Sequence, residues 1–177
     1  VPLERQTQAM NILAKYVFAP DVLISIQPLY NYLQQQRRGF SHYGKNEDPK
    51  AHKMILGMQK TVLAQLLHPA VMLRISDTAL YGNEYSLTQF MDDLTASIFV
   101  DSKESTSVSR NLQIEYVNQL IAIAGLGKAS KHDNLAKTAA LYQLTQIADT
   151  SVGWGADTAT KAHKKYIDHL IAKALEA

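Results

Sequence analysis

The chain of 177 residues is 46% hydrophobic and 19% charged, a balance typical of a folded globular protein and not of a disordered one. Its 18 basic and 16 acidic residues leave a net charge of +2 and form no long runs, which gives no electrostatic basis for binding nucleic acid or an anionic membrane. No apolar run reaches the roughly 18 residues of a membrane span, and the absence of cysteine excludes disulfides, thiol nucleophiles and thiolate metal sites.

Apolar residues recur at helical spacing through the first half of the chain. They occupy one face of the opening segment until Ala19-Pro20 breaks the helix. Residues 34–48 contain glycines and many polar side chains without periodicity, and they predict the longest loop. A helix resumes at Pro49 and is interrupted by His68-Pro69. The predicted helices of this half are residues 2–18, 28–33, 49–67 and 69–80, with a short helical turn over residues 21–26.

The second half continues the same periodicity and shows no strand-like alternation. Ser86 suits an N-cap position, and Gly125-Leu126-Gly127 suits a helix end. The predicted helices are residues 86–98, 107–125, 133–150 and 157–175. The last of them is predicted to face inward with Ala159, Ala162, Tyr166, Ile167, Leu170, Ile171 and Ala174. We therefore predict an all-α protein, an irregular bundle of seven or eight helices.

The segment 107–125 is predicted to be the centre of this bundle. Two adjoining arcs of the helix are apolar, which leaves only a narrow polar ridge. The apolar positions are Val108, Leu112, Tyr116, Leu120 and Ile123 on one arc and Ile114, Val117, Ile121 and Ala124 on the other. A helix that is apolar over most of its circumference must be enclosed by other helices.

The residue patterns predict no catalytic or metal-binding residue in this chain. His163 and His169 are six residues apart, which places them on opposite sides of a helix, and no His-Glu-x-x-His motif occurs. We expect the histidines to be solvated or to cap helices. Asp92-Asp93 point about 100° apart on a helix, which does not suit a pair that shares a proton.

Two groups of residues are candidates for contacts and not for chemistry. The first is a basic, aromatic loop that could touch a partner surface or an acidic substrate, although a solvated loop is the simpler interpretation; it comprises Arg37, Arg38, Phe40, His42 and Tyr43. The second is the polar ridge of Arg110, Asn111, Glu115 and Asn118, which is predicted to tie helices together by hydrogen bonds.

Several of these segments together resemble a known family. The segments are Leu3-Glu4-Arg5-Gln6, Leu66-Leu67-His68-Pro69, Arg74, Tyr85-Ser86-Leu87 and Arg110-Asn111-Leu112-Gln113 with Tyr116-Val117. In this combination the chain resembles the C-terminal helical region of large bacterial zinc-dependent metalloproteases of the metzincin kind. The resemblance runs from near Val1 to the last helix, and the Arg-Asn-Leu-Gln and Tyr-Ser-Leu segments contribute most to it.

The resemblance implies that this chain is a non-catalytic part of a larger protease. The zinc site of the family is an extended His-Glu-x-x-His motif upstream of this region, so the resemblance assigns no catalytic or metal residue here and places zinc in the parent protein. Residues 1–177 would then form a single helical domain that braces the catalytic domain or shapes its cleft. Its partners would be that domain and a protein or peptide substrate, in a secreted, periplasmic or outer-membrane-attached protein.

Two other functions remain open from the sequence. One is a free-standing helical module that binds a protein or peptide in a groove between helices. The other is a small enzyme whose site assembles from distant residues, which requires a deep pocket where Arg110, Glu115 or a histidine converges with other groups.

Overall fold

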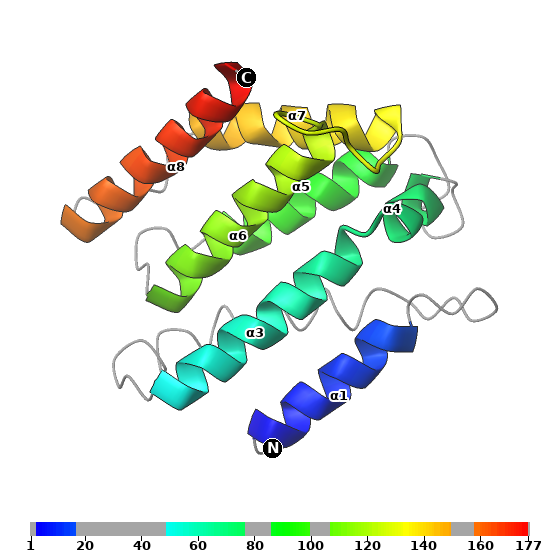
Figure 1. Ribbon diagram of the computed structural model, residues 1–177, viewed down its shortest axis with the longest axis vertical. Helices are drawn as coiled ribbons and strands as arrows, with labels where there is room; N and C mark the ends of the chain where they lie inside the picture. Colours follow the sequence, from blue (N-terminus) through cyan, green and yellow to red (C-terminus); the bar gives the residue numbers. More distant parts are fainter. Residues whose placement is uncertain (1–2, 17–48, 77–85, 100–106, 150–157, 177) are drawn as a thin grey trace.

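The computed structural model describes residues 3–16, 49–76, 86–99, 107–149 and 158–176, and within these ranges it contains seven α-helices and no strand (Figure 1). The helices are α1 (Leu3–Tyr16), α3 (Pro49–Leu66), α4 (Pro69–Ser76), α5 (Ser86–Phe99), α6 (Ser107–Ala124), α7 (Asn134–Asp149) and α8 (Thr158–Glu176). The predicted all-α class is confirmed for these ranges. The predicted segments 21–26 and 28–33 lie outside them.

The helix boundaries follow from local capping. His68 caps the start of α4, because its Nδ1 accepts a hydrogen bond from the backbone N–H of Ala70 at 3.1 Å. Asp133 caps α7 in the same way and accepts from the N–H of Ala136 at 2.9 Å. Each cap satisfies a backbone donor that has no partner within its own helix.

Helix α6 is the centre of the packing, as its apolar circumference predicts. It contacts α3, α5, α7 and α8, while α1 packs on the outer side of α3 (Figure 1). The side chains of Leu112, Tyr116, Leu120 and Ile123 are buried, and Ile114 and Ile121 are partly buried against the same core. This arrangement confirms the predicted central helix.

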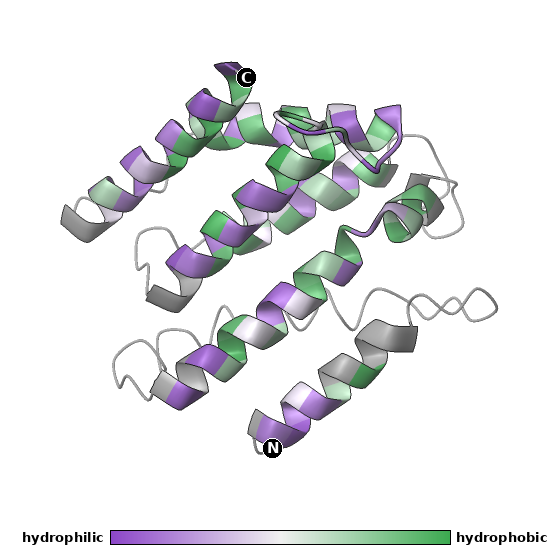
Figure 2. Cartoon of the chain, in the orientation of Figure 1, coloured by the Kyte–Doolittle hydropathy of each residue, from purple (hydrophilic) through white to green (hydrophobic). Residues whose placement is uncertain are grey.

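The buried apolar side chains form one cluster that draws on every helix from α3 to α8. In Figure 2 hydrophobic residues dominate α4 and the C-terminal end of α6, whereas α8 alternates hydrophilic and hydrophobic positions. On the described residues no helix is both long enough and apolar enough to cross a membrane.

The inward face of α8 differs from the prediction. Ile167 and Ile171 are buried as expected, but Ala162 is exposed and Tyr166 is 49% exposed. Thr160 and His163 are buried in their place. Residues 160, 163, 167 and 171 share one helical face, so the two isoleucines set the rotation of α8 and carry two polar side chains into the core. The side chain of Ala159 lies outside the described part of the structure.

We expect Leu120→Ala to lower the free energy of unfolding by about 2 to 5 kcal/mol, because the deletion opens a cavity in a close-packed core. Leu120 is fully buried in α6, and Leu135, 58% exposed on α7, offers the same deletion at the surface. Leu135→Ala should change the stability by less than about 0.5 kcal/mol. Urea unfolding of both variants measures the difference, and equal losses would contradict the central position of α6.

Candidate functional site

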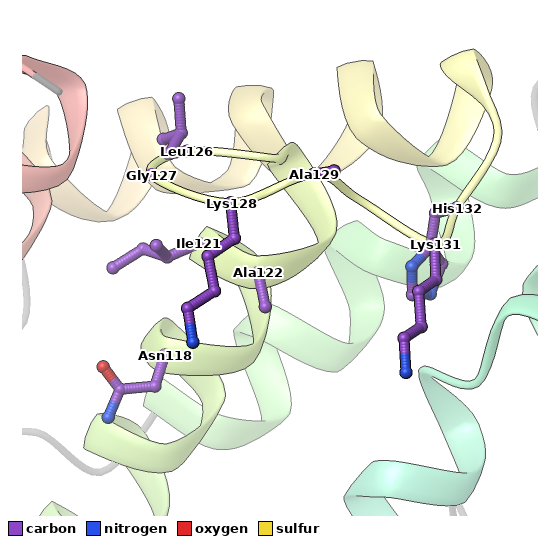
Figure 3. Close-up of a pocket in the computed structure, with 9 residues that line it drawn as sticks. All are labelled: Asn118, Ile121, Ala122, Leu126, Gly127, Lys128, Ala129, Lys131 and His132. Atoms are coloured by element: carbon purple, nitrogen blue, oxygen red, sulfur yellow. The ribbon is translucent and has the colours of Figure 1, made fainter.

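A hollow of about 580 Å³ lies where α6 ends and the loop 125–133 begins (Figure 3). Its lining is largely apolar and carries two lysines and no carboxylate. The lining residues are Asn118, Ile121, Ala122, Leu126, Gly127, Lys128, Ala129, Lys131 and His132. Cavities of this size commonly accept small molecules or short peptide segments.

The loop that forms one wall of the hollow is fixed by the way α6 ends. Gly125 has a φ of 75°, a conformation that side chains disfavour, and it lets the chain reverse. Its N–H donates to the carbonyl of Ala122, and the N–H of Leu126 donates to that of Ile121, both at 3.2 Å. These two bonds form a Schellman motif. The glycine-terminated helix end predicted at Gly125 is therefore confirmed.

Ser130 and His132 hold the rest of the loop. The Ser130 hydroxyl donates to the carbonyl of Ile123 at 2.6 Å and accepts from the backbone N–H of His132 at 3.1 Å. The His132 Nε2 lies 2.7 Å from the carbonyl oxygen of Leu67. Because a carbonyl only accepts, this ring nitrogen carries the proton. The loop is thus tied both to α6 and to the junction between α3 and α4.

The surroundings of the hollow are electropositive. Lys128 and Lys131 are exposed, and the part of the chain that the structure describes places no carboxylate against either. They extend from the loop toward the same side, Lys128 beside Asn118 and Lys131 beside His132 (Figure 3). Burial, together with His132 and Lys131, lowers the pKa of His68. The arrangement can therefore accept an apolar group that carries negative charge.

A second group of polar side chains is buried between α5, α6 and α8. The amide Nε2 of Gln113 donates to the carbonyl of Ile98 at 3.1 Å, which turns its oxygen toward His163 at 2.8 Å. The His163 Nε2 therefore donates to that oxygen. Burial and the nearby guanidinium of Arg110 lower the pKa of His163 to about 4, so the ring is neutral at pH 7.

The histidines were expected to be solvated or to cap helices, and for His163 this expectation is wrong. Its ring is buried and bonds to the side chain of Gln113. The sequence contains one indication of this buried pair. Gln113 is polar but lies on an apolar arc of α6, three positions before Tyr116. A polar residue on a buried face requires a buried partner, but the sequence does not identify which residue supplies it.

The residues of the polar ridge do not meet at one site. Arg110 lies close enough to His163 to affect its pKa, and the side chain of Asn111 is partly buried. The carboxylate of Glu115 lies 3.9 Å from the ammonium of Lys60 on α3 and accepts from Gln119 at 3.3 Å. Asn118 is exposed and lines the hollow. The proposed tying role of the ridge stays a prediction.

The predicted contact loop lies outside the described residues. This applies to Arg37, Arg38, Phe40, His42 and Tyr43, whose role also stays a prediction. Sequence analysis did not identify Lys128 and Lys131 as site residues. Their only signal was their position after a helix-terminating glycine, which does not show that a hollow lies beside them.

The described side chains include histidine, aspartate and glutamate, the residue types other than cysteine that bind zinc. Within these ranges no group of three histidine, aspartate or glutamate residues is placed to hold a metal ion. These side chains therefore do not fit the three protein ligands that a catalytic zinc requires.

Comparison with known families gives a match over the first part of the chain. A family model described as Met-zincin matches residues 1–106, which include α1, α3, α4 and α5. The match confirms the resemblance for those residues, while Arg110-Asn111-Leu112-Gln113 and the hollow lie beyond it. The family implies zinc in related proteins. No curated protein and no solved structure is significantly similar to the chain.

The low pKa of His163 predicts a loss of stability in mild acid. The unfolded state binds a proton near pH 6.5 and the folded state only near pH 4, so stability falls as the pH decreases between these values. Between about pH 7 and about pH 5 the wild type should lose about 2 kcal/mol more than His163→Gln, whose amide can still donate to Gln113 but does not titrate. Urea unfolding at both pH values measures the difference, and equal losses would show that His163 does not contribute.

Proposed function

The chain belongs to the Met-zincin family, and from this membership we propose that it is a non-catalytic helical region of a zinc-dependent metallopeptidase. In this proposal it is the C-terminal domain of a bacterial secreted or envelope-bound enzyme. It packs against the catalytic part and either braces that part or shapes access to its cleft. Zinc and the catalytic residues belong to another part of the polypeptide.

One observation carries this proposal. The chain matches a family of zinc peptidases, yet its 177 residues contain no His-Glu-x-x-His motif, and the side chains that the structure describes form no group of three metal ligands. A zinc peptidase of this kind needs two histidines on one helix face as zinc ligands and the glutamate between them as general base. A supporting, non-catalytic role is consistent both with membership of the family and with the missing zinc motif.

The outer face of α7 supports a docking role. Leu135 and Tyr142 are seven residues apart, which places them on the same helical face, and they are 58% and 47% exposed. Leu141, which is 39% exposed, lies about 100° around the helix from Tyr142. Grouped apolar side chains at a surface commonly mark a contact with another protein surface. We propose that the catalytic part of the same polypeptide covers this face.

A second candidate function is a free-standing helical module that binds a protein or peptide. The hollow beside Lys128 and Lys131 favours it, because this site offers apolar surface and positive charge without catalytic groups. The gene distinguishes the two candidates: a His-Glu-x-x-His motif upstream in the same reading frame supports the peptidase region.

The first experiment measures peptide hydrolysis by the isolated chain. With zinc added, the 177-residue chain should not cleave a quenched-fluorescence peptide library, whereas the parent polypeptide should do so. A Glu→Gln change in the parent's zinc motif is the control and should abolish cleavage. Chelator-sensitive cleavage by the isolated chain would contradict the proposal.

The second experiment tests the docking face in the parent polypeptide. Tyr142→Asp should lower the melting temperature of the catalytic part or its peptidase activity, because it places a charge in an apolar contact. Tyr166→Asp is the matched control, since Tyr166 on α8 is 49% exposed and Tyr142 is 47% exposed. Equal effects of the two substitutions, or none from either, would argue against α7 as the docking face.

A further inference from the structure

The hollow beside the end of α6 combines an apolar lining with two flanking ammonium groups. We propose that it binds an extended acidic peptide segment, with an apolar side chain in the hollow and carboxylates beside Lys128 and Lys131. The proposal concerns binding without hydrolysis. It is therefore independent of the peptidase assignment and can fail without affecting it.

The apolar part of the site fits one side chain of moderate size. Ile121, Ala122 and Leu126 contribute hydrocarbon to the lining, and the volume of about 580 Å³ exceeds what a single leucine needs. The remaining space accommodates the backbone of the residues on either side. A peptide side chain that enters the hollow removes apolar surface from water on both partners.

The charge of the site favours an acidic partner. Lys128 and Lys131 are exposed, and none of the residues that line the hollow is acidic. The neighbouring Asp133 uses its carboxylate to cap α7 and is 2.9 Å from the N–H of Ala136. Burial, His132 and Lys131 lower the pKa of His68, which favours its neutral form, so the two lysines supply the positive charge of the site. Complementary charge at the rim of a site mainly directs which partner binds.

Asn118 distinguishes a peptide from a fatty acid, which also combines a carboxylate with an apolar chain. Its amide is exposed at the edge of the hollow, beside Lys128 (Figure 3). A side-chain amide can donate to a carbonyl and accept from an N–H, the two groups that a peptide unit presents. A hydrocarbon chain offers neither group. The lining therefore suits a peptide backbone better than a lipid tail.

The wall of the hollow is formed before any ligand arrives. The Schellman motif at Gly125, the Ser130 hydroxyl on Ile123 and the His132 ring on Leu67 hold the loop on three sides. A site that is already ordered loses less conformational entropy when it binds. The ordered loop can therefore contribute to affinity.

Fluorescence anisotropy tests the proposal with the short labelled peptide Gly-Glu-Asp-Leu-Asp-Glu-Gly and the 177-residue chain. The wild type should bind it, and raising the salt from about 50 mM to about 300 mM should weaken binding. Replacing both Lys128 and Lys131 by Met should weaken it about tenfold, because two exposed charge pairs are lost. Ala122→Phe should also weaken it by filling the hollow, with helicity checked by circular dichroism.

Matched controls isolate the site. Lys161→Met removes an exposed lysine of α8 and should leave binding unchanged. A peptide with lysines in place of the acidic residues, and one with serine in place of leucine, should bind at least about tenfold more weakly. No binding of the acidic peptide to the wild type would overturn the proposal. Equal binding of the lysine peptide, equal loss in Lys161→Met, or displacement by dodecanoate as effective as by unlabelled peptide would also overturn it.

Discussion

The burial of α6 is the constraint on which the other packing depends. Its apolar side chains cover so much of the circumference that a single neighbour could not remove them from water, and α3, α5, α7 and α8 all contact it. Helix α7 packs against α6 through small side chains. Ala136, Ala139 and Ala140 are buried along the first half of α7, which allows the backbones of α6 and α7 to approach closely. Larger Leu144 and Ile147 fill the space further along.

Buried polar pairs then fix positions that apolar packing leaves open. An apolar face tolerates small rotations of a helix because hydrophobic contacts are not directional. The Gln113 amide, held by the carbonyl of Ile98, accepts from His163 and so locks the rotation of α8 against α6. The hydroxyl groups of Tyr116 and Thr95 join α6 to α5 in a comparable way. Leaving either partner unpaired in the core would carry a desolvation cost.

The extent to which the sequence predicts this structure follows from the range of each interaction. Helix periodicity and caps are local, so the bounds of α3, with Pro49 at its start and His68 after its end, could be predicted within a residue or two. The inward face of α8 could not be predicted in this way, because Tyr166 is exposed and His163 is buried. His163 bonds to Gln113, a residue fifty positions earlier in the sequence. The hollow depends on the bond between His132 and Leu67, sixty-five residues apart in sequence, and no local pattern contains it.

The end of α6 links the packing to the candidate site. Gly125 must adopt a positive φ for the chain to turn back along α6, and a Cβ there would lie 3.3 Å from the Cβ of Ser130. The residue that terminates the central helix thus also sets how closely Ser130 approaches it. Because Ser130 in turn holds the backbone of His132, whose ring reaches Leu67, the shape of the hollow is set by the capping of α6 and by its distance from α3. Any movement between α6 and the α3–α4 junction would therefore change the shape of the hollow.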